Sequence, residues 1–460
     1  MTSNESESSV EKSLPGVKAS NVIARERKVI GSALQVRFYP LVVERAKGAL
    51  LWDVDGNSYL DFSAGAAVAC TGYGHPKVVS AIKNEVDKLT HQCFTLASNE
   101  ITIELAEKLV KLLEREGKAK VWYGLSGGDA NECVYKLVPD YSKKRRIISF
   151  MGSYQGMTMG ALSLSGHKAL QKFMGFANVV KVPYPYCYRC PFKGEYPECG
   201  MMCVDFIESQ VMQSVSPAED TCCIVVEPIQ SDSGEVVPPD DFMPRLKKLC
   251  EKYGMYLAVD EIKSGFGRTG EMFAFQHSKI SPEIITLAKP IASGMPLSAC
   301  VAPSEILDSS VGSHLMTTAG NPISCAAALA TLEVIQEERL VENAAAVGSY
   351  MKKRLMELKE NHPLIGEVRG KGLMIGVELV KDQETKEPAA IETAKLTYHC
   401  WEKGLIVINL ATFSNVVEIT PPLVLTKELA EEGLVRFEQA LTDVEKGKVP
   451  DERLGAYKSW

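Results

Sequence analysis

Short apolar, β-rich runs alternate with helical segments through the middle of this 460-residue chain. Between residues 120 and 302 the runs are VWYGLS, RIISF, CCIVVEP, YLAVDE and EIITLA, and residues 241–253 have the periodicity of a helix between two of them. Strands that alternate with helices form parallel βαβ units, because a parallel neighbour is reached only through a crossover connection. The sequence therefore predicts an α/β fold built on a mostly parallel sheet.

The flanking segments have a different character. Residues 39–62 alternate apolar and polar side chains around Asp55-Gly56-Asn57, which predicts a hairpin. Helices are expected at 76–89, 100–116, 322–336, 343–360 and 392–403, and strands at RGKGLMIGVELV and GLIVINL. A chain of this length exceeds what one compact core supports, so we expect a large domain and a smaller one.

Charge and hydropathy exclude several classes of partner. The chain has 51 basic and 58 acidic residues, a net charge of -7, and no long run of either sign. This balance argues against a nucleic-acid or anionic-membrane partner. The first dozen residues are polar and acidic, and no stretch reaches the roughly 18 apolar residues that a membrane span needs. We expect a soluble, cytoplasmic protein with a mobile N-terminus.

Two of the apolar runs end on residues that can do chemistry. Leu257-Ala258-Val259 leads into Asp260, and the run from Ile284 ends on Lys289. Open α/β sheets bind ligands at the carboxyl ends of their strands. Pyridoxal 5'-phosphate chemistry requires a lysine that forms a Schiff base with the cofactor and a carboxylate that keeps the pyridine nitrogen protonated. Lys289 and Asp260 are the candidates for these two roles.

Four longer motifs carry a resemblance to a known family. In chain order they are VVEPIQSDSGEVVPP, LAVDEIKSGFGRTGEMFAF, IITLAKPIASGMPLSA and TTAGNPISCAAALATLEVI. They resemble the class III pyridoxal-phosphate aminotransferases of fold type I, a group with ornithine and 4-aminobutyrate aminotransferases and archaeal-type amino-acid racemases. The resemblance covers roughly residues 38–441. It implies a mostly parallel seven-stranded-type sheet in a large domain, and a smaller α+β domain.

The resemblance also implies how the chain is divided. We expect a mobile extension at 1–30, a large cofactor-binding domain at 71–335, and a small domain made of 31–70 and 336–460. The resemblance also implies a homodimer or a dimer of dimers, in which each active site is shared across the subunit interface. The expected ligands are pyridoxal 5'-phosphate and a small amino-acid or amine substrate.

A glycine-containing turn is the candidate phosphate site. Ser126-Gly127-Gly128 follows a strand-like run and enters a helix, where backbone amides can approach a phosphate at the positive end of the helix. A plain tight turn is the alternative. The presence of Asp260 and Lys289 in the same chain favours phosphate binding.

Further cofactor contacts are implied by the resemblance, motif by motif. Tyr154 matches the aromatic residue that stacks on the pyridine ring, and its neighbour Gln155 stands where the family usually has histidine. Thr317 matches the hydroxyl that reaches the phosphate of the partner subunit. Glu227 is expected at the cofactor site.

Lys263 is a second lysine near the expected cofactor. It stands where relatives commonly carry glutamine, within reach of the cofactor's phenolic oxygen. Lys263 follows Asp260 by only three residues and would lie too close to it along one strand and turn to reach the aldehyde on the far side of the ring. Lys289 is therefore preferred as the residue that holds the cofactor.

Two arginines of the family are absent. Ornithine and 4-aminobutyrate aminotransferases use them as bidentate partners of substrate carboxylates, and this chain has Met157 and Glu418 in their places. We expect Glu418 close to Glu227, where two like charges would favour a substrate with a distal ammonium group. The alternative is that Glu418 points to solvent.

Two reactions remain open at this point. The first is transamination of an amino acid or an ω-amino or diamino substrate. The second is racemisation or epimerisation of an amino acid, which needs no keto-acid acceptor and hence no second carboxylate site. The fold alone does not distinguish them.

The cysteines are numerous, with 13 in the chain. Four form the pattern Cys187-x2-Cys190-x8-Cys199-x3-Cys203 among prolines and glycines. Such spacing is compatible with a zinc knuckle, with a disulfide or with free thiols. The resemblance requires no metal, so none is predicted at the active site.

Overall fold

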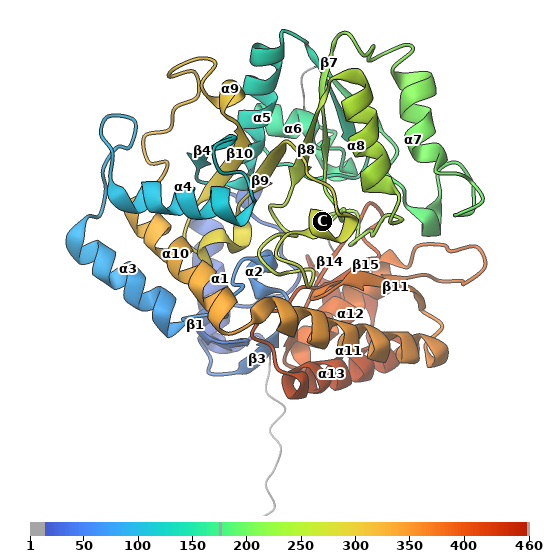
Figure 1. Ribbon diagram of the computed structural model, residues 1–460. Coiled ribbons are helices and arrows are strands. Elements are labelled where there is room, and N and C mark those ends of the chain that lie inside the picture. The colour runs from blue at the N-terminus through green and yellow to red at the C-terminus, as the bar shows by residue number, and fades with distance from the viewer. Residues whose placement is uncertain (1–13, 174–176, 458–460) are drawn as a thin grey trace, which may run out of the picture.

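The computed structural model describes residues 14–173 and 177–457. Its largest sheet has seven strands in the order β4-β10-β9-β8-β7-β5-β6 (Figure 1). The strands are β4 (Ala119–Gly124), β5 (Arg146–Phe150), β6 (Val179–Val182), β7 (Thr221–Val226), β8 (Tyr256–Asp260), β9 (Ile284–Leu287) and β10 (Ser298–Pro303). All are parallel except β10, which is antiparallel to both neighbours. The predicted mostly parallel α/β fold is confirmed.

The central strands are buried on both faces. Every residue of β7 and β9 is buried, and such strands read as continuous apolar runs. Helix α5 (Gly127–Ser142) packs on one face, and α8 (Phe242–Tyr253) and α10 (Pro322–Glu337) belong to the core on the other. Alternate residues of a strand serve the two faces: Val225 belongs with α5, and Val226 with α8.

Two smaller sheets lie beside the large one. The C-terminal sheet is antiparallel, in the order β11-β12-β15-β14. Its strands are β11 (Ile365–Lys371), β12 (Met374–Leu379), β14 (Ile408–Leu410) and β15 (Val416–Ile419). Helices α11 (Leu340–Asn361), α12 (Ala390–Glu402) and α13 (Lys427–Glu445) lie with it at the bottom of Figure 1.

The third sheet joins the two ends of the chain. Strands β1 (Val43–Lys47), β2 (Leu50–Asp53) and β3 (Ser58–Asp61) are consecutive and antiparallel, and they include the hairpin expected at 39–62. Strand β13 (Leu405–Ile406) pairs with β3 in parallel. The N-terminal segment is therefore anchored by the C-terminal one.

Helices α3 (Pro76–Lys88) and α4 (Glu100–Leu112) begin where the sequence predicts them. Helix α4 ends earlier than expected, because Glu114 has a left-handed φ of 56°. RGKGLMIGVELV is two strands instead of one, with Gly372 at a φ of 54° in the turn between β11 and β12.

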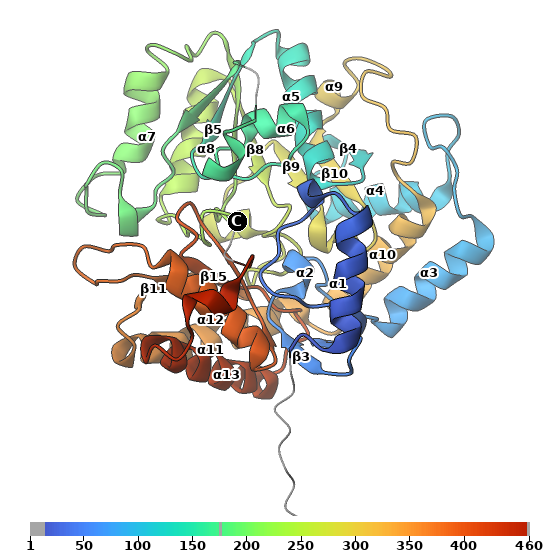
Figure 2. The same cartoon turned by 180° about the vertical axis from the view of Figure 1, so that it is seen from behind.

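The N-terminal extension contains a helix that composition did not reveal. Helix α1 (Val17–Val29) lies on the surface that Figure 2 shows. The Asp55 carboxylate accepts hydrogen bonds from the N–H groups of Lys18 and Ala19 at 3.0 and 2.9 Å and so caps its N-terminus. Helix α1 covers residues 17–29 of the segment expected to be a mobile extension up to residue 30. Residues 1–13 lie outside the described part.

A buried carboxylate links the large sheet to the C-terminal sheet. Glu378 of β12 accepts hydrogen bonds from Arg369 of β11 at 2.6 Å and from Arg189 at 2.5 Å, and a further one from Tyr186. Tyr186 and Arg189 belong to the segment after β6, so the bond network spans both sheets. None of the helices in residues 14–173 and 177–457 is both long and apolar enough to cross a membrane.

Candidate active site

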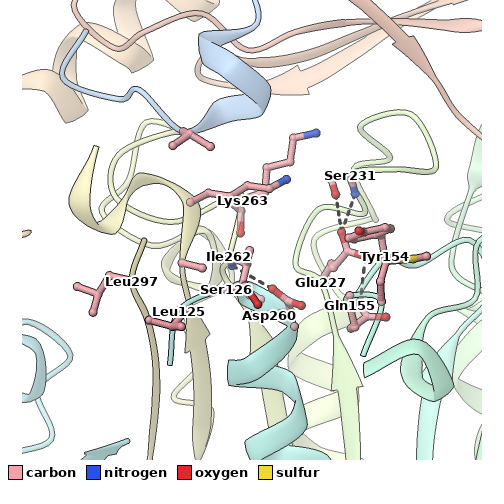
Figure 3. A pocket seen from close by; sticks show the side chains of 18 of the residues that line it. Leu125, Ser126, Tyr154, Gln155, Glu227, Ser231, Asp260, Ile262, Lys263 and Leu297 are labelled. Atoms are coloured by element: carbon pink, nitrogen blue, oxygen red, sulfur yellow. Dashed lines mark hydrogen bonds between the residues drawn. The ribbon is translucent and has the colours of Figure 1, made fainter. Parts of the chain in front are cut away.

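A cavity of about 640 Å³ opens beyond the carboxyl ends of β7, β8 and β9 (Figure 3). Most of the predicted site residues line it: Ser126, Gly127, Gly128, Tyr154, Glu227, Asp260, Lys263 and Lys289. They come from segments up to 163 residues apart, since the parallel strands deliver their ends to one edge of the sheet. Thr317 is exposed and does not line the cavity of its own chain.

Asp260 is held in one orientation at the cavity wall. Its Oδ2 accepts a hydrogen bond from Asn131 Nδ2 at 2.8 Å, and its Oδ1 accepts one from the Ile262 N–H at 3.0 Å. Asn131 also donates to the Gln155 carbonyl and accepts from the Thr286 hydroxyl, which fixes its amide. Burial raises the pKa of Asp260 to about 6, and the Asn131 bond and the Lys289 charge oppose that shift. An ionised Asp260 would therefore gain from a cationic partner.

The turn before α5 is shaped as a cradle. Ser126 and Asp129 form a capping box, in which the Asp129 carboxylate accepts from the N–H groups of Leu125 and Ser126 at 2.9 and 2.8 Å. A Cβ on Gly127 would lie 2.8 Å from Ile262, whereas one on Gly128 would meet nothing closer than 3.5 Å. Its nearest neighbours would be Ser126 Oγ at 3.5 Å and Thr158 Oγ1 at 3.6 Å, which are ordinary van der Waals distances, and Gly128 both lines the cavity and lies in the first turn of this 16-residue helix. This arrangement suits a phosphate group.

Glu227 connects two segments that border the cavity. Its Oε1 accepts from the Tyr154 N–H at 3.0 Å and from Gln155 Nε2 at 3.2 Å, and its Oε2 accepts from the N–H and hydroxyl of Ser231 at 2.8 and 2.9 Å. Burial, together with the nearby Asp260 charge, raises the pKa of Glu227 to about 7. Figure 3 shows Tyr154, Gln155 and Ser231 gathered around this carboxylate. Glu227 thus sets the position of the Tyr154 segment.

Lys263 has two buried carboxylate partners. Its Nζ donates to Glu235 Oε1 at 2.7 Å and to Glu418 Oε2 at 2.5 Å. Glu418 is 1% exposed and also accepts from the Thr420 hydroxyl at 2.8 Å. The expectation that Glu418 forms an uncompensated pair with Glu227 is wrong, and so is the alternative that it points to solvent, because Lys263 lies between the sheets and binds it.

Asn131 and Glu235 were not anticipated as site residues. Asn131 follows Gly127 by one helical turn, and a polar residue at that spacing on a buried helix face was an available signal. Glu235 has no comparable signal, since it meets Lys263 only through the turn that brings Gln230 against Val236.

The cysteines are free thiols throughout the chain. The four of the Cys187–Cys203 pattern act on one another electrostatically: burial, and then the other three thiols, raise the pKa of Cys203 to about 12. Among the described residues, no three or more His, Cys, Asp or Glu side chains are arranged to hold a metal ion. Neither a disulfide nor a zinc site is therefore supported.

Known proteins resemble this chain over nearly its whole length. The leucine/methionine racemase of Thermococcus litoralis is 43% identical over 96% of this chain and 100% of its own length. The isoleucine 2-epimerase of Lentilactobacillus buchneri is 40% identical over 94% of this chain and 96% of its own length. A 5-aminovalerate aminotransferase of Pseudomonas aeruginosa is 35% identical over 86% of this chain and 92% of its own length.

Solved structures agree with the fold. A Bacillus anthracis aminotransferase superposes with a TM-score of 0.86 at 32% identity, covering 92% of this chain and 98% of that one. An amine transaminase from an uncultivated Pseudomonas species, solved with bound pyridoxal 5'-phosphate, superposes with a TM-score of 0.83 at 31% identity, covering 88% of this chain and 95% of that one.

The cavity fits pyridoxal 5'-phosphate. The turn at Gly128 suits the phosphate group, the buried Asp260 suits the ring nitrogen, and Lys289 suits the aldehyde. The cofactor of this protein is pyridoxal 5'-phosphate. The family model for class III aminotransferases matches residues 32–441. The chain belongs to the class III aminotransferase family, whose members similar to it include both aminotransferases and amino-acid racemases.

Proposed function

We propose that this protein is an amino-acid racemase or epimerase that acts on amino acids with uncharged side chains. The observation that carries the proposal is the absence of arginine from the described residues that line the cavity. The lining cations are Lys263, which is already paired with two glutamates, and Lys289. Transamination with 2-oxoglutarate needs partners for two carboxylates, whereas racemisation needs a partner for one.

The side chains around Lys289 support an uncharged substrate. Apolar lining residues include Val68, Ile229, Met295 and Leu297. Relatives at 40–43% identity are named for leucine and methionine, for alanine and serine, and for isoleucine. All of these amino acids have uncharged side chains.

The residues divide the work as follows. When bound, pyridoxal 5'-phosphate supplies the electron sink that makes the substrate's α-proton acidic. Lys289 would hold the cofactor and move a proton at the α-carbon on its own face, and Asp260 would keep the ring nitrogen protonated. Inversion requires a proton to return to the opposite face of that carbon. Tyr154, positioned by Glu227, would stack on the ring. The turn of Ser126 to Gly128 would hold the phosphate, and Lys263 would be a partner for the phenolic oxygen.

Transamination is the second candidate. The family model and relatives named as 5-aminovalerate and 4-aminobutyrate aminotransferases, at 33–35% identity, support it. The same Lys289 and Asp260 would serve that reaction. It would need a binding group for the second carboxylate from outside the described lining, such as the partner subunit.

Assembly and location are part of the proposal. Homodimerisation is supported by the loop of residues 308–320, which carries Thr317 and exposes Val311 and Leu315. The loop is anchored where Trp122 stacks on His314 at 4.5 Å and donates to its carbonyl at 2.8 Å. A cytoplasmic location is supported by the free state of all the cysteines.

The deciding experiment is chiral chromatography of single L-amino acids incubated with the enzyme, with and without 2-oxoglutarate or pyruvate. Appearance of the D-amino acid, or of the epimer of isoleucine, without any keto acid supports racemisation. A strict requirement for keto acid, with no inversion, contradicts it and supports transamination. The Lys289→Ala variant is the control for non-enzymatic inversion.

A further inference from the structure

Lys263 lines the cavity, and two buried glutamates, Glu235 and Glu418, are paired with it behind the lining. Lys263 follows β8, Glu235 lies in the turn between Gln230 and Val236, and Glu418 is in β15 of the C-terminal sheet. Lys263 is 6% exposed, Glu235 0% and Glu418 1%. Figure 3 shows Lys263 on the side of the cavity that faces the C-terminal part of the chain. We call these three residues the ionic wall.

The surroundings of the two carboxylates shift their pKa values in opposite directions. Burial raises the pKa of Glu235 well above its ordinary value, with Lys263 opposing and Glu418 adding to the rise. Burial would also raise the pKa of Glu418, but the charges of Lys263 and Lys289 outweigh it and hold that pKa below its ordinary value. The positive charge of Lys263 therefore cancels the negative charge of Glu418.

The wall lies near the reacting end of the cavity. Glu418 is close enough to Lys289 to feel its charge, and Lys263 lines the cavity itself. Without the Lys263 ammonium, Glu235 and Glu418 would lie behind the cavity lining without the counter-ion that they share in this structure. A buried, uncompensated carboxylate attracts a cation strongly, because little water screens it.

We propose that Lys263 is a specificity-determining residue, which neutralises Glu235 and Glu418 and thereby makes the cavity select amino acids with uncharged side chains. The inference rests on the proposed function, since it assumes that an amino acid reacts at its α-carbon here. It does not depend on whether that reaction ends in racemisation or in transamination.

The test compares lysine with norleucine, which have the same chain length and differ by the terminal ammonium group. Exchange of the α-proton for deuterium in D2O, followed by NMR, reports reaction at the α-carbon in either reaction. The wild type should prefer norleucine. In Lys263→Gln the ratio of kcat/KM for lysine to that for norleucine should rise by about tenfold or more, as expected for one unpaired charge in a partly screened pocket.

Three variants isolate the charge. Lys263→Arg keeps the ammonium's charge and should keep the wild-type ratio. Lys263→Gln combined with Glu418→Gln also removes the carboxylate whose pKa is held low and should move the ratio back toward that of the wild type. Lys181→Gln is the matched control, since Lys181 is a half-buried lysine that donates to the Ser163 carbonyl and does not line the cavity.

Thermal unfolding of the apoproteins separates specificity from a purely structural role. Lys263→Gln should lower Tm, and the double variant should recover part of the loss. The proposal would be overturned if Tm recovers in the double variant while the lysine-to-norleucine ratio of kcat/KM stays within about twofold of the wild type in every variant. Chiral chromatography on the same samples tests racemisation separately, so a failure of the proposed function is distinguishable from a failure of this inference.

Discussion

At the scale of single residues, the two lysines of the cavity have opposite surroundings. The carboxylates of Glu235 and Glu418 hold Lys263 as an ammonium ion, because their charges raise its pKa in spite of burial. No carboxylate within 4.0 Å pairs with Lys289 among the described residues. An amine must lose its proton before it can attack an aldehyde, so Lys263, which is held as an ammonium ion, is a poor nucleophile.

The first prediction concerns this difference. Borohydride reduction of the cofactor-loaded protein should fix the cofactor on the peptide that contains Lys289, as read by mass spectrometry. Lys263→Arg should be labelled as the wild type is, and Lys289→Ala should not be labelled. A cofactor adduct on Lys263 would contradict the assignment.

Asp260 should make cofactor binding depend on pH. Its pKa is raised from 3.8 to about 6, mainly by burial, so in the empty site it gains a proton as the pH falls through about 6. A neutral Asp260 cannot pair with a protonated ring nitrogen, and affinity should therefore fall on the acid side. In titrations between about pH 5 and 8, Asp260→Asn should bind the cofactor more weakly and lack this step. If cofactor affinity fell with pH in the same way in the wild type and in Asp260→Asn, the pH dependence would belong to another group.

Some site residues follow from sequence and others do not. The place of Asp260 and Lys289 at the cavity was predictable, because Asp260 ends β8, Lys289 follows the end of β9 by two residues, and strand ends meet at one edge of a parallel sheet. The partners of Lys263 were not. Glu418 is 155 residues away and reaches Lys263 only because the C-terminal sheet packs against the end of β8.

At the scale of elements, the start of helix α5 gives a prediction about phosphate binding. Gly128→Ala should leave the apoprotein as stable as the wild type within about 1 kcal/mol, because the new Cβ would meet nothing closer than 3.5 Å. The methyl group would add bulk at the cavity lining in the first turn of the helix and should weaken cofactor affinity by about tenfold or more. Isothermal titration of the apoprotein measures it.

Gly117→Ala is the matched control for that measurement. Gly117 is a glycine with no atom within 4 Å of its Cβ position, and it does not line the cavity. It has a φ of 69°, so alanine costs some stability there but should leave cofactor affinity unchanged. An unaltered affinity in Gly128→Ala would place the phosphate elsewhere.

The sequence reveals the elements that depend on their own residues and does not reveal those that depend on distant contacts. Strands β7 to β9 are continuous apolar runs because both faces are buried, and such runs are visible in the sequence. The residues of β10 do not show that it is antiparallel. Its direction depends on the short connection from Lys289 to Ser298, which turns the chain back beside β9. Helix α1 depends on the distant cap that Asp55 supplies, and its composition alone did not reveal it.

At the scale of the whole molecule, the exposed Thr317 predicts complementation between subunits. Inactive Lys289→Ala protomers mixed with impaired Thr317→Ala protomers should regain about a quarter of wild-type activity, since random exchange makes half the dimers mixed and each mixed dimer has one intact site. Racemisation or α-deuteration of norleucine measures the recovery. Light scattering or mixed-tag capture verifies the exchange.

The control is each inactive protomer exchanged with itself, which should regain nothing. Thr317→Ala must be severely impaired alone for the test to be meaningful. Exchange without recovery would mean that each site is completed within one chain.

Glu378 and Glu418 are buried carboxylates of the C-terminal sheet, and each is bound by a cation from the large-sheet side, Arg189 and Lys263. Separating the two sheets would leave Glu418 without Lys263 and Glu378 with only Arg369 of its own sheet, and breaking a buried pair costs about 3–5 kcal/mol. The two parts of the molecule should therefore melt cooperatively, as one calorimetric transition whose van't Hoff and calorimetric enthalpies agree for the dissociated subunit. Glu378→Gln should broaden or divide that transition, whereas a substitution at an exposed ion pair such as Lys120 with Asp308 should leave it single.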